Sequence, residues 1–216
     1  DPDKGANDRF LSLEMVWLEN KLLRSYVLSP RLGQISADLL GVSKIRLYHD
    51  NVLAKQSGCG RTPWHYDDHH FPLDTNDVVT AWIPAQPTPL EMGPLSFAYP
   101  LDVHKLVNAI KFEKKGSNYD RGVAEVFSKN GVSVNETPFE LGEVSFHHNL
   151  NFHTASRNGT SRSRIALANT YYRDGARVIN SPTMVSGDWQ KFMPNVKPGD
   201  IAASPLNPIC WPVDDN

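Results

Sequence analysis

The chain has 216 residues, of which 40% are hydrophobic and 21% charged, and its formal net charge is −2. This composition excludes a largely disordered chain, and the small charge gives no electrostatic reason to bind nucleic acid or an anionic membrane. Two cysteines make no disulfide framework, and no apolar run is long enough to span a bilayer.

The first predicted elements are helices. Apolar residues recur at three- and four-residue intervals over residues 10–27, which predicts an amphipathic helix that ends at Ser29-Pro30. A second short helix is predicted over residues 32–40, with Gly41 as its C-cap. We expect both helices to support the fold rather than to carry chemistry.

From residue 44 the hydrophobic period changes to two, which indicates strands. Ile45, Leu47 and His49 alternate with Lys44, Arg46 and Tyr48, and further strands are predicted at residues 52–55, 78–84, 93–99, 132–134, 142–146 and, as the last one, 164–172. Apolar residues at helical spacing between about 103 and 129 predict an insertion of one or two helices. Prolines without a clear period after residue 175 predict a segment that wraps the surface.

Many short strands, with helices gathered at the start and in one insertion, predict a mainly β fold with added helices, either a sandwich or a barrel. We expect a single domain over residues 1–216, divided into N-terminal helices (about 8–41), a β core (about 44–175) with a helical insertion (about 103–129), and a C-terminal wrap (176–216). The expected location is cytoplasmic, although the sequence begins Asp1-Pro2-Asp3 without a methionine.

A candidate metal site is the strongest chemical signal. His65 and Asp67 are two residues apart, so in an extended strand both side chains point to one side and can bind one ion. Eight histidines and 24 acidic residues in 216 positions give roughly one such pair by chance, so the pair alone is a weak signal. His153 would complete two imidazoles and one carboxylate, a set typical of non-haem iron(II). His147 and His148 compete with His153 for the third position.

The residues after His153 support its choice. Arg164 follows eleven positions later and opens an apolar, strand-like run. A guanidinium at the start of a buried strand needs an anion, and its planar fork fits the far carboxylate of a dicarboxylic cosubstrate. Arg157 and Arg162 compete for this role, but they precede the strand, where side chains are more often solvated.

These residues together resemble the phytanoyl-CoA dioxygenase family of iron(II)- and 2-oxoglutarate-dependent oxygenases. The resemblance covers roughly residues 44–173. It rests on Thr-Pro-Trp-His-x-Asp at 62–67, Val-Thr-Ala-Trp-Ile-Pro at 79–84 and Gly-Glu-Val-Ser-Phe at 142–146, followed by His153, Asn158 and Arg164.

The resemblance implies a double-stranded β-helix, that is, a cupin-like jelly roll, in which His65, Asp67 and His153 hold Fe(II). The cosubstrate 2-oxoglutarate would chelate the iron through its keto-acid end and present its far carboxylate to Arg164, and O₂ would be the oxidant. Two further residues match family positions near the cosubstrate: Trp82 and Lys55.

The chain differs from the family pattern in three places. Residues 99–104, Tyr-Pro-Leu-Asp-Val-His, replace a Pro-Gly-Ser-His segment that is common after the Gly-Pro-Leu strand. Tyr66 stands where relatives often have glutamine, and on a strand it would face away from the ligands. Ala155 stands where relatives often have a serine that helps to hold the cosubstrate, so Thr154 or Ser156 would have to supply that hydrogen bond.

These features favour a dioxygenase that hydroxylates or otherwise oxidises a C–H bond of a small organic substrate and releases succinate and CO₂. Relatives that transfer halide have a small residue in place of the carboxylate ligand, so Asp67 favours oxidation without halide. The alternatives are a jelly-roll metal-dependent isomerase or hydrolase that does not use O₂, which would not need Arg164, and a catalytically silent binding module, which would need no intact ligand set.

The substrate class is less defined than the reaction. No strongly basic cluster indicates a site for the phosphates of coenzyme A, which favours a small hydrophobic or mixed-polarity metabolite, such as a natural-product intermediate. His69 and His70 follow the first ligands directly and are expected at the rim of the site. The sequence does not determine the oligomeric state.

Overall fold

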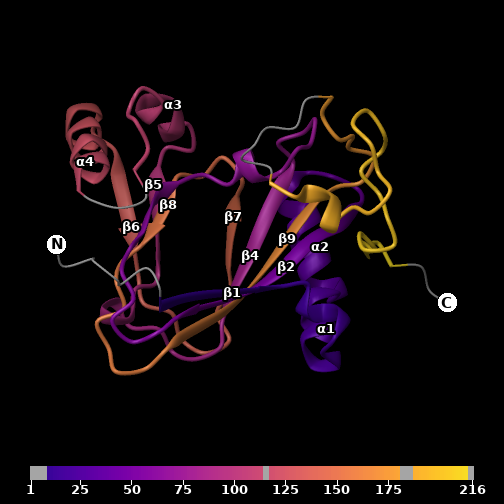
Figure 1. The fold of residues 1–216 in the computed structure, drawn as a ribbon, viewed down its shortest axis with the longest axis horizontal. Coiled ribbons are helices and arrows are strands. Elements are labelled where there is room, and N and C mark those ends of the chain that lie inside the picture. Colours follow the sequence, from indigo (N-terminus) through magenta and orange to yellow (C-terminus); the bar gives the residue numbers. More distant parts are fainter. Residues whose placement is uncertain (1–8, 114–116, 181–186, 214–216) are drawn as a thin grey trace.

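The computed structural model describes residues 9–113, 117–180 and 187–213, and its core is a pair of antiparallel sheets with helices on the outer faces (Figure 1). The strands are β1 (Phe10–Glu14), β2 (Ile45–Lys55), β3 (Thr62–His65), β4 (Val78–Pro84), β5 (Leu95–Tyr99), β6 (Ser133–Glu136), β7 (Ser145–His148), β8 (His153–Ala155), β9 (Arg164–Arg173) and β10 (Ile209–Trp211). The larger sheet has the order β1-β2-β9-β4-β7, with β10 also paired to β2, and the smaller sheet has the order β3-β8-β5-β6. The fold is the expected jelly roll.

Two N-terminal helices cover the outer face of the larger sheet. Helix α1 (Lys21–Val27) begins after Asn20, whose side chain accepts a hydrogen bond from the backbone N–H of Leu23. Helix α2 (Pro30–Leu40) ends at Gly41, whose φ of 68° is the left-handed conformation that glycine adopts without strain. The structure confirms this second helix. Val27 of α1 and Ala37 of α2 belong to one buried cluster with residues of the larger sheet, namely Leu47, Val79, Ala81 and Tyr171.

The predicted insertion consists of two helices over the outer face of the smaller sheet (Figure 1). These are α3 (Val103–Val107) and α4 (Asn118–Asn130). Their buried side chains pack around Phe152, and the ring of Trp64 stacks on the same phenylalanine with the centroids 5.5 Å apart. Among the helices in the described ranges, none is long and apolar enough to cross a bilayer.

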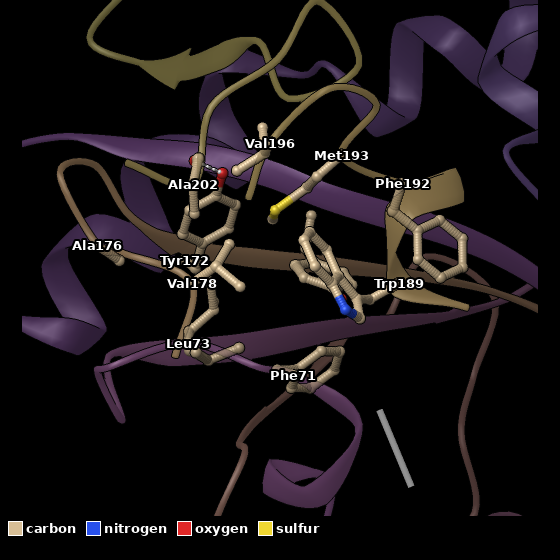
Figure 2. Packing of buried hydrophobic residues seen from close by; sticks show 12 residues of the cluster. Phe71, Leu73, Tyr172, Ala176, Val178, Trp189, Phe192, Met193, Val196 and Ala202 are labelled. Atoms are coloured by element: carbon tan, nitrogen blue, oxygen red, sulfur yellow. Dashed lines mark hydrogen bonds between the residues drawn. The ribbon is translucent and has the colours of Figure 1, made fainter. Parts of the chain in front are cut away.

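The segment after β9 packs into a hydrophobic cluster rather than lying loosely on the surface. Trp189, in a 3-10 turn, and the fully buried Met193 point into this cluster (Figure 2). Tyr172 at the end of β9 donates a hydrogen bond from its hydroxyl group to the carbonyl of Ala202. The chain then returns to the larger sheet as β10, so the prediction that residues 164–172 form the last strand was wrong.

The prediction of one helix over residues 10–27 was also wrong, because its first part is strand β1. Phe10 pairs with Lys55 and Glu14 with Asn51 along β2. Leu11 and Leu13, two residues apart, lie on the outer side of this edge strand and are 50% and 61% exposed. Backbone pairing with β2, distant in sequence, overrides local periodicity here.

Strand β2 is continuous, so the separate strand predicted at residues 52–55 is part of it. The register with β9 shifts between Leu47 and His49. Such a bulge places two successive side chains on one face, and the rings of Tyr48 and His49 do contact each other, with centroids 5.2 Å apart. The structure also contains the short strand β8, which the sequence pattern did not predict.

Removing the indole of Trp189 should destabilise the fold strongly. The residue is 3% exposed, and truncating a buried tryptophan to alanine costs about 3–5 kcal/mol. Urea unfolding of Trp189→Ala should show this loss. Leu13→Ala, at a position 61% exposed, is the control and should change the free energy of unfolding by less than about 0.5 kcal/mol. Equal losses in the two variants would contradict the packing described.

Asp50 should give the protein a measurable pH dependence of stability. Burial raises its pKa from 3.8 to about 6, although the N–H of Val16 donates a hydrogen bond to its carboxylate. Between these values the folded state holds a proton that the unfolded state has lost, so the free energy of unfolding falls as the pH rises through this window. Between pH 4 and pH 7 the free energy of unfolding of the wild type should fall by about 1–3 kcal/mol relative to that of Asp50→Asn.

Urea unfolding at several pH values measures this difference. Asp38→Asn, on the exposed side of α2, is the control and should keep the pH dependence of the wild type. A wild type and an Asp50→Asn variant with parallel pH profiles would show that Asp50 is ionised in the folded protein.

Candidate metal centre

The structure brings the three predicted ligands to one point. Strands β3 and β8 pair with His65 opposite His153, and the two ring centroids are 4.2 Å apart. Oδ1 of Asp67 lies 3.6 Å from Nε2 of His65 and 3.9 Å from Nε2 of His153. One ligand atom from each residue therefore lies within 4.8 Å of the other two, which suits a single bound ion.

Backbone carbonyls fix the orientation of both imidazoles. Nδ1 of His65 lies 2.8 Å from the carbonyl oxygen of Pro63, and Nδ1 of His153 lies 2.9 Å from that of Asn151. A carbonyl can only accept, so each Nδ1 carries the proton and donates it. The lone pair of each Nε2 is then directed toward Asp67, which is the tautomer that binds metals.

The ionisation states also suit metal binding. Burial lowers the pKa of His153 to about 3 and lowers that of His65 as well. Burial alone would raise the pKa of Asp67, but the imidazoles of His153, His147 and His65 outweigh it and hold that pKa well below its usual range. At neutral pH the cluster therefore offers two neutral imidazoles and a carboxylate.

His147 and His148, the two competitors for the third ligand position, take other places. His147 is buried beside the cluster, with Nε2 3.5 Å from Oδ2 of Asp67 and its ring centroid 4.7 Å from that of His153. Nδ1 of His148 accepts a hydrogen bond from the N–H of Leu150 instead. His147 thus contacts the carboxylate rather than completing the set.

The candidate ligands line a cavity of about 480 Å³ that also contains Arg164 and Trp82. Arg164 is 2% exposed and donates one hydrogen bond from Nη1 to the carbonyl of Gly93, 2.9 Å away. Its Nε is buried without a partner, and no carboxylate pairs with it among the described residues. Burial lowers the pKa of Arg164 to about 10, so the guanidinium stays charged at neutral pH.

Gly93 allows the chain to approach Arg164 closely. Its φ is 74°, and a Cβ atom there would lie 2.2 Å from the carbonyl oxygen of Ser156. Only glycine fits this position, which directs the Gly93 carbonyl at the guanidinium.

The residues present fit both groups that the family resemblance implies. Two imidazoles and one carboxylate suit a divalent iron ion with open coordination positions. In the same cavity, Nε of Arg164 and Nε1 of Trp82 are buried donors without partners, and the guanidinium lies 5.3 Å from the Trp82 ring centroid. Such donors suit the far carboxylate of a small diacid.

The other predicted cosubstrate residues take different positions. Lys55 is buried opposite Arg164, and its Nζ donates to the carbonyls of Ala155 and Ser156 rather than lining the cavity. Burial, and then the charge of Arg164, lower the pKa of Lys55 to about 7. Thr154 touches the cavity, but its hydroxyl group donates to the carbonyl of Thr62.

The structure does not bring Ser156 to the cavity. Side chains alternate along β8, so His153 and Ala155 face inward, while the Ser156 hydroxyl donates outward to Glu136, 3.1 Å away. Relatives often have a serine at the position of Ala155. Because the Ser156 hydroxyl points away from the cavity, Ser156 does not take the place of that serine.

Among the cavity residues that sequence reasoning missed is His49. In the alternating pattern it shares a face with Ile45 and Leu47, which pack under the helices. The bulge in β2 turns His49 to the opposite face, where it lines the cavity. An alternation count cannot reveal a bulge, so no signal in the sequence would have found this residue.

Comparison with known families agrees with this geometry. A family model described as phytanoyl-CoA dioxygenase (PhyH) matches residues 6–166, well over half of the chain. The chain belongs to the phytanoyl-CoA dioxygenase family. The matched region contains the three candidate ligands and Arg164. Among curated protein sequences, none matches the chain.

Solved structures with the same fold include enzymes from natural-product pathways. The non-heme alpha-ketoglutarate-dependent carbocyclase SnoK from nogalamycin biosynthesis has a TM-score of 0.72 at 24% identity, over 93% of this chain and 76% of that one. The epimerase SnoN, in complex with Fe3+, alpha ketoglutarate and nogalamycin RO, has a TM-score of 0.70 at 19% identity, over 94% and 78%. EctD from S. alaskensis, with 2-oxoglutarate and 5-hydroxyectoine, has a TM-score of 0.64 at 14% identity, over 90% and 68%.

His153→Ala should abolish tight binding of iron(II), whereas His148→Ala should not. Mutation of a residue that only hydrogen-bonds to a metal ligand typically lowers the metal affinity about 10- to 100-fold. Loss of a ligand itself should therefore lower the affinity for iron(II) by more than about 100-fold. Anaerobic titration calorimetry with iron(II) measures both affinities. If both variants kept the wild-type affinity, His153 would not be a ligand. If both lost affinity equally, the loss would reflect a general disruption of neighbouring strands.

Proposed function

We propose that this protein is an iron(II)- and 2-oxoglutarate-dependent dioxygenase that oxidises a C–H bond of a small organic substrate. The observation that carries the proposal is the shared cavity of the His65, Asp67 and His153 cluster and Arg164. A charged guanidinium without a carboxylate partner is costly in a buried site unless an anion binds there.

Each residue would have a separate task. His65, Asp67 and His153 would hold the ion, and Arg164 would bind the far carboxylate of 2-oxoglutarate and so orient it. When bound, iron(II), 2-oxoglutarate and O₂ supply the oxidation of the C–H bond, with release of succinate and CO₂. The cavity walls exclude water from this chemistry and position the substrate.

We propose hydroxylation as the reaction rather than halide transfer. Asp67 would occupy the coordination position that a halide would need on the iron. Related structures of a carbocyclase and an epimerase belong to proteins named for other outcomes. Mass spectrometry of the product distinguishes these outcomes, since hydroxylation adds one oxygen atom, ring closure removes two hydrogen atoms, and epimerisation leaves the mass unchanged.

A metal-dependent isomerase or hydrolase that does not use O₂ fits the ligand set but leaves Arg164 without a purpose. Anaerobic addition of iron(II) and 2-oxoglutarate separates the two functions. Chelation of the keto acid to iron(II) gives a weak visible charge-transfer band. Absence of that band from the wild type, with iron bound, would favour the O₂-independent enzyme.

Arg164→Met should weaken the binding of 2-oxoglutarate much more than that of iron(II). The variant loses hydrogen bonds to a charged partner, worth about 1.5–3 kcal/mol each, so half-saturation of the visible band should need about 10- to 100-fold more 2-oxoglutarate. Arg162→Met is the matched control, because Arg162 is exposed before β9.

The affinity for iron(II), measured in the same titrations, should be similar in both variants. If the requirements for iron and 2-oxoglutarate rose together in Arg164→Met, the arginine would support the fold rather than the cosubstrate. If Arg162→Met showed the larger effect, the carboxylate site would lie elsewhere.

A further inference from the structure

The cavity lining includes the exposed side chains of Glu14, Asp188 and Lys191, and we call this end the mouth; none of the proposed tasks uses it. Its walls here include His49 from β2, Phe71 from the loop after the ligands, and Phe192 from the C-terminal segment. The centroids of His49 and Phe192 are 4.5 Å apart, and those of His49 and Phe71 are 6.2 Å apart. One polar ring thus lies between two apolar ones.

His49 is the polar residue in this part of the cavity whose bonding is incomplete. Its Nδ1 is buried without a hydrogen-bond partner. Burial lowers the pKa of His49 to about 4, a shift that the nearby charge of Asp67 opposes. The ring is therefore neutral at physiological pH, and a neutral imidazole offers one donor and one acceptor.

Strand register connects His49 with the metal centre. His147, Thr80, Thr170 and His49 form one row across β7, β4, β9 and β2. Neighbouring strands are about 4.8 Å apart, so the row spans about 14 Å of backbone from His147, which contacts Asp67, to His49. A molecule of one or two rings fits that span.

Arg164 lies at another end of the same cavity. It begins β9, about 20 Å of strand from Thr170 in the row of His49. A diacid held between the guanidinium and the metal centre would therefore leave the His49 end of the cavity free for a second molecule.

The charged side chains at the mouth already have partners. Nζ of Lys191 lies 2.5 Å from Glu14 and 3.3 Å from Asp188, and it also lies 4.7 Å from the centroid of the Phe192 ring. A substrate carrying phosphates or a free carboxylate would have to break these pairs, since no other lysine or arginine among the described residues lines the mouth. The mouth therefore favours an uncharged molecule.

We propose that His49 determines substrate specificity by hydrogen-bonding a hydroxyl or carbonyl oxygen of a neutral, mainly apolar ring molecule held against Phe71 and Phe192. This inference rests on the proposed function and adds the substrate class to it. It excludes acyl-CoA thioesters and zwitterions as the preferred substrates of this chain.

Three probes with one carbon skeleton test the role of His49: tetralin, 1-tetralol and 1-tetralone. Only the last two carry an oxygen. Equilibrium dialysis against protein with iron(II) and 2-oxoglutarate under argon should show about five-fold tighter binding of the oxygenated probes, the value of one neutral hydrogen bond of about 1 kcal/mol. In His49→Phe this preference should vanish, and His49→Gln, which can still hydrogen-bond, should retain it.

Other outcomes would overturn the inference. These are a preference for the oxygenated probes that survives in His49→Phe, equal binding of all three probes to the wild type, binding of none of them, and tighter binding of phytanoyl-CoA or ectoine than of 1-tetralol. The visible band, recorded on each sample, reports separately on the cosubstrate site. Its absence would count against the proposed function, while dialysis still decides the role of His49.

Discussion

The pairing of two short strands, β3 and β8, is the constraint on which the rest of the site depends. It places His65 directly opposite His153, although many elements separate them in the chain. A shift of one residue would send one imidazole to the far face of the sheet, among the aromatic side chains that pack under the insertion. The two outer helices α3 and α4 therefore have an indirect role, because they bury Trp64 and Phe152 and so hold this register.

Several buried polar groups that lack a hydrogen-bond partner line the cavity. Arg164, Trp82 and His49 each keep a buried nitrogen without a partner, and all three line the same space. Each such group costs folding free energy, which proteins tolerate mainly where a ligand supplies the missing bond. Between the metal centre and His49, the hydroxyls of Thr80 and Thr170 pair with each other, 3.0 Å apart.

Local patterns in the sequence predicted the parts of the structure that local interactions determine. Helix α2 has its own caps, and strand β4 is a continuous apolar run. His65 and Asp67 do reach one site, but Asp67 lies in a turn after the end of β3 rather than in the strand that their spacing suggested. Strand β1 was missed because its partner is distant in sequence. The bulge at Tyr48 and the outward direction of Ser156 depend on register between strands, which no short stretch of sequence encodes.

The family pattern and the cavity wall do not cover the same residues. The family match ends at residue 166, whereas Thr170, Lys191 and Phe192, which lie beyond it, line the cavity. The candidate ligands and the guanidinium belong to the matched part of the chain, and one part of the cavity wall belongs to the part outside it. Substitutions in the C-terminal segment can therefore change which molecule the cavity binds without changing the candidate metal ligands or Arg164.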